Sequence, residues 1–208
     1  MMMTTYRRRL LAAALLALAP LAALHAESLA PDELVKQIST DVIEAAKTDK
    51  AIQAGDIKRV AVLVEQKVMP HVNFQRMTAS AVGRYWRQAS PEQQQRLQAE
   101  FKLLLLRSYA GALSQVKDQT VELKATRGRP DDGEVVVRTE LRGRGDAIQL
   151  DYRLEKAGND WKIYDVNVLG VWLVENYRNS FAQEISANGL DGLISKLEQR
   201  NKAAAAKG

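Results

Sequence analysis

The sequence predicts an α+β domain in which an antiparallel sheet of about four strands has helices packed on one face. The spacing of apolar residues supports this class, because it changes twice along the chain. Apolar residues recur every three or four positions up to about residue 117, alternate with polar residues over 120–168, and return to helical spacing over 171–197. The links between the alternating stretches are hairpin-sized, which indicates an antiparallel meander.

The first half of the chain is expected to form four helices. Apolar residues repeat every four positions through residues 31–47, which predicts the first helix. Asp56 is a suitable N-terminal cap for the second helix, which Pro70 ends, and Asn73 is a suitable cap for the third. The third helix is expected to carry four apolar residues on one side: Phe74, Met77, Val82 and Trp86.

The fourth helix has the clearest start. Ser90, Pro91 and Gln93 supply the cap, the proline of the first turn and the glutamine of a capping box. The stretch Leu103–Leu106 is apolar around the whole helix, which indicates either complete burial or the wall of an apolar cavity. Up to about Lys117 the helix carries Leu97, Phe101, Leu104, Leu105, Tyr109, Leu113 and Val116.

Alternation then predicts four strands, at residues 120–126, 134–141, 147–155 and 160–168. In the third strand the even positions are apolar and the odd positions polar, so one face is expected to meet a core and the other to meet water. Helical spacing resumes at Val171, breaks at Asn188–Gly189 and continues to Leu197. The alanine-rich end, residues 203–208, is expected to fray.

The composition is that of an ordinary globular domain. The chain has 208 residues, of which 46% are hydrophobic and 26% charged, and these values exclude a disordered chain and a coiled-coil rod. The chain contains no cysteine, which excludes disulfide scaffolds, thiolate metal sites and thiol catalysis. The net charge of +5 on its own would suggest a nucleic acid or an acidic surface as partner.

Residues 1–26 have the layout of a secretory signal peptide. Arg7–Arg9 precede an apolar run from Leu10 to Leu18, Pro20 breaks the run, and Leu24–Ala26 offers a cleavage site. The competing interpretation is a membrane anchor, but the apolar stretch is shorter than the ~20 residues that span a bilayer. We therefore expect cleavage near Ala26 and export of the remaining chain.

Cleavage changes the charge argument. Loss of Arg7–Arg9 leaves 27 of the 30 basic residues against 25 acidic ones, a net charge of +2. Such a chain has no broad electrostatic footprint for nucleic acid, although Arg127–Pro130 matches the core of a minor-groove hook. Because that tetrapeptide lies in a predicted turn, where Gly and Pro are expected, no nucleic-acid partner is predicted.

The residues of the exported chain offer little catalytic chemistry. His71 is its single histidine, and the sequence has no H-E-x-x-H, G-x-S-x-G or Walker motif, so no metal ligands, catalytic residues or cofactor are expected. Asp165 stands in a mostly apolar strand and is expected to be buried. A structural hydrogen-bonding role is favoured for it over a catalytic one.

Several segments of the chain form a recognisable series when they are taken in order. They are Val82–Arg87, Ser90–Gln93 with Phe101 and Tyr109, Trp161–Val166, Gly170–Val171, Asn176–Phe181 and Gly189–Ile194. This series resembles the MlaC family of periplasmic phospholipid-binding proteins, also called the toluene-tolerance auxiliary component family. The resemblance covers about Leu34 to Leu197. One position departs from the family pattern, because Trp172 stands where a small serine usually follows Gly-Val.

The resemblance implies a non-enzymatic carrier in the periplasm, with a phospholipid-binding domain over residues 27–202. Such a carrier shuttles lipid between an outer-membrane lipoprotein–porin complex and an inner-membrane ABC transporter bearing MCE-domain subunits. This traffic maintains the lipid asymmetry of the outer membrane.

A carrier needs an apolar cleft for the acyl chains. We expect this cleft between the apolar sheet face and the helices of the first half, although the same residues could simply form a packed core. The expected lipid-binding residues are Val135, Val137, Leu141, Ile148, Leu150 and Tyr152 from the sheet, and Phe74, Trp86, Phe101, Leu105 and Tyr109 from the helices. The main alternative function is a periplasmic chaperone or interaction protein that binds apolar polypeptide on this surface. A secreted hydrolase is a more distant one.

Overall fold

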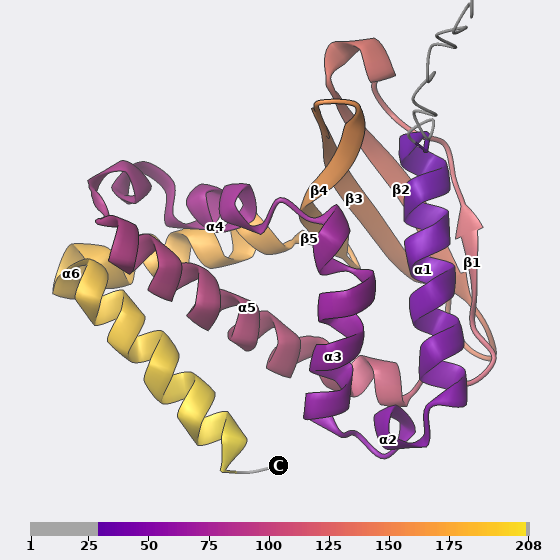
Figure 1. Ribbon diagram of the computed structural model, residues 1–208, viewed down its shortest axis with the longest axis horizontal. Coiled ribbons are helices and arrows are strands. Elements are labelled where there is room, and N and C mark those ends of the chain that lie inside the picture. The colour runs from indigo at the N-terminus through magenta and orange to yellow at the C-terminus, as the bar shows by residue number, and fades with distance from the viewer. Residues whose placement is uncertain (1–28, 207–208) are drawn as a thin grey trace, which may run out of the picture.

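The computed structural model describes residues 29–206, and the predicted signal peptide lies outside this range. Figure 1 shows α1 in front of a twisted sheet, with α4, α5 and α6 beside the sheet and α3 between the two parts. The helices are α1 (Pro31–Thr48), α2 (Lys50–Gln53), α3 (Ile57–Lys67), α4 (Phe74–Val82), α5 (Pro91–Ser114) and α6 (Leu173–Ala205). Short 3-10 turns cover Met69–His71 (η1), Gly83–Gln88 (η2) and Pro130–Asp132 (η3).

The sheet has five antiparallel strands in chain order, which confirms the α+β class. The strands are β1 (Thr120–Leu123), β2 (Glu134–Arg142), β3 (Ile148–Ala157), β4 (Asp160–Val168) and β5 (Val171–Trp172). The sequence predicted the first four and placed Val171 at the start of a helix. In the structure Val171 pairs with Val168, and Trp172 with Asn167. Two residues are too few to show a period, so only the pairing reveals β5.

Three of the six α-helices in the described part of the chain begin with the side-chain cap that the sequence predicted. Asp56 accepts hydrogen bonds from two backbone amides of α3, and Asn73 accepts one from Arg76 in α4. Ser90 and Gln93 form the complete capping box of α5. The third predicted helix is shorter than expected, because α4 ends at Val82 and the chain tightens into η2 before Trp86. The cause is Gly83, whose φ of 66° ends the α-helical ladder.

The core consists of three clusters of buried side chains. The sheet cluster joins α1 to the sheet, the helix cluster joins α4, α5 and α6, and the junction cluster joins α1, α2 and α3 to the end of α5. The sheet cluster contains Leu34, Val35, Ile38, Val135, Val137, Leu154, Trp161 and Ile163. The helix cluster contains Met77, Ala81, Val82, Leu97, Phe101, Leu104, Val174, Tyr177, Phe181, Ile185, Leu193, Ile194 and Leu197. The junction cluster contains Ile43, Ala46, Ile52, Val60, Leu63, Ala110 and Val116.

The last helix bends sharply at the predicted break. Gly189 has a φ of 72° inside α6, and Figure 1 shows α6 turning there and running back along α5. Asn201 fastens the returning half, since its amide donates hydrogen bonds to the carbonyl and the carboxylate of Glu100. The helix continues to Ala205, so Ala203–Ala205 of the tail that was expected to fray are helical, and residues 207–208 lie outside the described part.

Phe101 is the centre of the helix cluster, and its truncation should strongly destabilise the folded protein. Its ring is 0% exposed and lies 5.1 Å from the Tyr177 ring and 5.3 Å from the Phe181 ring, measured between centroids. Phe101→Ala should lower the free energy of unfolding by about 3–5 kcal/mol in urea titrations. Tyr109→Ala, two turns further along α5 and 37% exposed, is the matched control and should cost less than about 1 kcal/mol. Equal losses for the two variants would contradict this description of the core.

Candidate functional site

One face of the sheet carries nearly all of its apolar side chains. Residues paired directly across antiparallel strands point to the same face. Val135 pairs with Leu154 and Val137 with Tyr152, while Leu150 pairs with Val168, which itself pairs with Val171. We call this surface the apolar face. It comprises Val121, Leu123, Val135, Val137, Leu141, Ile148, Leu150, Tyr152, Leu154, Trp161, Ile163, Val166, Val168 and Val171.

Burial decreases along the apolar face from one end of the strands to the other. Val137 and Leu154 are 0% exposed where α1 lies on the sheet. Leu150 and Val168, further along the same strands, are half-buried. Ile148 is 38% and Val171 50% exposed at the far end. Apart from the buried Thr139, the apolar face therefore runs from the core to the surface.

The middle of the apolar face contains polar atoms that the protein itself satisfies. The hydroxyl of Thr139 donates to the carbonyl of Leu150 at 3.0 Å. Burial raises the pKa of the Tyr152 hydroxyl, and hydrogen bonding with Ser39 of α1 and with Thr139 partly offsets this rise. Since these polar groups have partners within the protein, they do not oppose an apolar ligand on this face.

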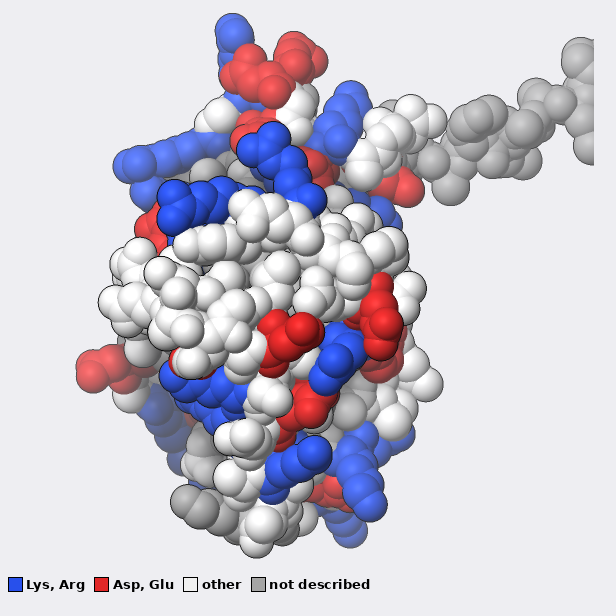
Figure 2. Space-filling model, turned by 90° about the vertical axis from the view of Figure 1, so that its left-hand side faces the viewer, with Lys and Arg blue, Asp and Glu red and all other residues white. Residues whose placement is uncertain are grey.

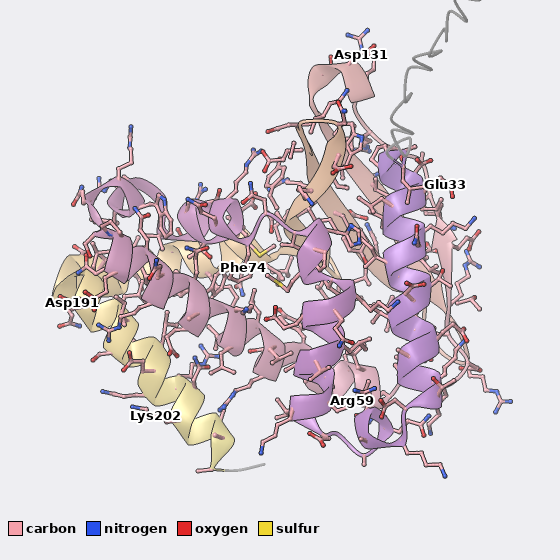
Figure 3. The ribbon with its side chains drawn as sticks, viewed as in Figure 1. Glu33, Arg59, Phe74, Asp131, Asp191 and Lys202 are labelled. Carbon is pink, nitrogen blue, oxygen red and sulfur yellow. The ribbon has the colours of Figure 1, made fainter. Side chains whose placement is uncertain are left out.

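The helix residues that were expected to line the cleft lie mostly in the helix cluster. Phe101 belongs to it, and Phe74, Trp86 and Leu105 pack against it. Figure 3 shows Phe74 in the interior beside α4, and its ring centroid is 5.9 Å from that of Phe101. Tyr109 is the exception, because its ring is partly exposed. Burial, followed by the neighbouring Tyr177, still raises the pKa of its hydroxyl.

The structure thus distributes the expected site residues over different parts of the core. Val135, Val137 and Tyr152 belong to or border the sheet cluster, Leu141 borders the junction cluster, and Leu150 and Ile148 lie beyond both. Val72, between η1 and α4, packs against both the sheet and the helix clusters. That the two sets line one cleft stays a prediction. Sequence reasoning left out Val166, Val168 and Val171, because only strand pairing assigns them to the apolar face.

Neither of the two best-formed hollows in residues 29–206 matches a two-chain lipid. Their volumes are about 240 and 190 Å³, and most of the residues that line them are polar or charged. Both are smaller than the ~300–1,000 Å³ of typical small-molecule sites. The first is lined by Leu29, Glu33, Lys36, Gln37, Thr40 and Asp41, and the second by Ser80, Arg153, Tyr164, Asp165, Val174, Glu175 and Arg178.

Asp165 anchors the start of α6 to the sheet. The carboxylate is 1% exposed and accepts hydrogen bonds from the backbone amides of Val166, at 2.9 Å, and Val174, at 3.1 Å. The guanidinium of Arg153 lies 3.0 Å away and stacks over the Trp172 ring, 3.9 Å from its centroid. Burial raises the pKa of Asp165, and these partners counteract the rise. The arrangement agrees with the structural role favoured for Asp165, and Trp172 packs under Arg153.

Other kinds of site have little support within residues 29–206. No three His, Asp or Glu side chains of this range are placed to hold a metal ion. None of its helices combines the length and apolarity needed to cross a bilayer. Figure 2 shows the left-hand side of Figure 1, where α4, α5 and the bend of α6 lie. Charges of both signs surround a broad uncharged area on this side. Such mixed charge on this side offers no continuous basic surface for nucleic acid.

Comparison with known proteins gives one consistent result. The profile of a family described as MlaC protein matches residues 36–199. The chain is 24% identical to an intermembrane phospholipid transport system binding protein, MlaC, of Haemophilus influenzae over 173 residues, 81% of each protein. It is 28% identical to the toluene tolerance protein ttg2D of Pseudomonas putida, over 98% of this chain and 96% of that protein.

A solved structure extends the similarity to three dimensions. A phospholipid-binding protein from Ralstonia solanacearum, in complex with a phospholipid, superposes with a TM-score of 0.81 at 46% identity. The match covers 84% of this chain and 98% of that one. The resemblance found in the sequence motifs is therefore confirmed.

The anchoring role of Asp165 can be tested with two substitutions. Asp165→Asn keeps an oxygen that can accept from Val174, whereas Asp165→Ala leaves both buried amides without a partner. The alanine variant should therefore be less stable than the asparagine variant by about 1–3 kcal/mol in urea unfolding. Equal stability of the two variants would show that the backbone hydrogen bonds to Asp165 do not hold α6.

Proposed function

We propose, from the premise that this chain belongs to the MlaC family, that it is a non-enzymatic carrier which binds phospholipid and moves it between membranes. The observation that carries the proposal is the apolar face, which extends from the buried core to an exposed end. Acyl chains laid along this face could enter at Ile148 and Val171 and reach inward toward Tyr152. The headgroup would stay at the exposed end, in water.

The energetics of acyl chains require such a surface. Two chains carry ~30 methylenes, and at ~0.8 kcal/mol each their exposure to water costs more than about 20 kcal/mol. A carrier must offset most of that cost and still release the lipid. An apolar protein surface of the same length meets both conditions, because it replaces the bilayer without adding strong directional contacts.

Binding would require the helix cluster to move away from the sheet. Hydrogen bonds and ion pairs join the helix cluster to the sheet. The backbone amide of Asn73 donates to the Ile163 carbonyl, Asp165 accepts from Val174, and Arg76 pairs with Glu134 and Glu155. Acyl chains entering beside these anchors would replace protein–protein contacts with protein–lipid contacts of the same apolar kind. The cost of opening would therefore be largely offset by the lipid itself.

The finer features of the proposal come from the family resemblance. We place the protein in the periplasm, exported by residues 1–26 and cleaved near Ala26. Its partners would be the outer-membrane lipoprotein–porin complex and the inner-membrane ABC transporter with MCE-domain subunits. Lipid exchange with both would maintain outer-membrane asymmetry.

Native mass spectrometry of the purified protein tests the carrier function directly. We expect a mass increment of one phospholipid, which thin-layer chromatography of an organic extract would identify. Protein that arrives free of phospholipid and takes none from vesicles would refute the proposal. Recovery of stoichiometric unfolded polypeptide instead of lipid would favour the chaperone alternative.

A charge placed on the apolar face should abolish lipid retention. Leu150→Arg puts a guanidinium among Val168, Ile148 and the entering acyl chains, where burying it is costly. We expect the lipid-bound fraction to fall below detection, with helix and strand signals preserved in circular dichroism. Gln149→Arg is the matched control, since the neighbouring side chain points to the opposite face and should retain lipid. Retention by both variants would remove Leu150 from the site.

A further inference from the structure

The turn between β4 and β5 has an unusual occupant. Val168 and Val171 pair across it, so Leu169 and Gly170 form a two-residue hairpin turn. Both have positive φ, 52° and 89°, and Leu169 is the one non-glycine residue with positive φ among residues 29–206. This is the pattern of a type I′ turn, whose first central position favours Asn, Asp or Gly.

Leucine at this position is unfavourable for the fold in two ways. Its side chain strains a left-handed backbone, and it is 66% exposed, so it gains little from burial. Asparagine would suit both the backbone and the water. The folded structure alone therefore gives no reason for Leu169, and an unfavourable residue at an exposed turn points to a contact outside the chain.

The turn lies at the exposed end of the apolar face. The amide of Leu169 donates to the carbonyl of Gln149 at 3.1 Å, which fixes the turn beside the start of β3. Ile148 and Val171 are exposed next to it. The exposed residues Ile148, Leu169 and Val171 form a group that we call the apolar tip.

The surroundings of the tip suit a lipid layer. The nine residues 166–174 carry no charge, so no charged side chain of this hairpin opposes transfer out of water. Trp172, half-buried beside the tip, stacks with Arg153. Tryptophan is enriched where membranes meet water, because its ring is apolar and its N–H polar.

We propose that the apolar tip inserts into the surface of a phospholipid bilayer during lipid exchange, an inference that rests on the proposed carrier function. Three side chains cannot supply the roughly 800 Å² per partner of a stable protein interface. They do suffice for a transient contact with a bilayer, which accepts single apolar side chains without shape complementarity. Insertion would bring the exposed end of the apolar face against the acyl chains that the carrier takes up.

Replacement of Leu169 by asparagine separates this contact from the fold. In flotation with vesicles of phosphatidylethanolamine and phosphatidylglycerol, Leu169→Asn should weaken the affinity for the vesicles about tenfold, measured from the lipid concentration at half-maximal flotation, which is the effect of losing one buried leucine side chain. The melting temperature should stay unchanged or rise, because asparagine suits the turn. Val62→Asn on α3, exposed to 41%, is the matched control and should bind vesicles like the parent. Unchanged flotation of Leu169→Asn would overturn the proposal.

A second pair of measurements separates the alternatives. If Leu169→Asn binds pure lipid vesicles normally but binds less to vesicles made from native membranes, the tip contacts a membrane protein and the bilayer proposal is wrong. Lipid content, measured on the same samples by native mass spectrometry, reports on the carrier function independently. A parent protein that floats with vesicles but holds no lipid would refute the carrier function and leave the tip contact supported.

Discussion

A sheet face that is apolar along most of its length, but covered over only part of it, governs this structure. Strand pairing brings apolar side chains of all five strands to one side, and α1 buries the part around Val137 and Leu154. Burial of these apolar side chains away from water stabilises the fold. The same face continues to Ile148 and Val171 at the surface, where it stabilises nothing within the chain. A globular protein that keeps such a surface accepts a cost that an apolar ligand would offset.

Helices α4, α5 and α6 form a second part of the molecule, which has its own packed core. Phe101 meets Tyr177 and Phe181 edge to face in the helix cluster, and the positive φ of Gly189 folds α6 back along α5. Polar and apolar contacts connect this part to the sheet. Asn73 bonds to Ile163, Asp165 accepts from Val174, Arg76 pairs with Glu134 and Glu155, and Val72 packs against both clusters. The proposed carrier function would require these connections to give way while each part keeps its own core.

Trp172 connects these observations with the one departure from the family pattern. Its ring lies under the guanidinium of Arg153, which in turn contacts Asp165 and Glu175. A serine could not fill this space, so the tryptophan adds apolar contact to the anchor of α6. Trp172 follows the apolar tip directly in the chain. The same side chain therefore packs against the anchor of α6 and adjoins the exposed hairpin turn.

Local signals in the sequence determined the class of the fold and most element boundaries. Caps such as Ser90–Gln93, the break at Gly189 and the alternation of β3 act through neighbours in the chain, so they can be read without the rest of the molecule. The sequence also identified which side of β2 and β3 is apolar. It could not show β5, the division of the core into three clusters, or the meeting of Asp165 with Val174. Those features depend on contacts between distant residues, and only the tertiary structure decides which distant residues meet.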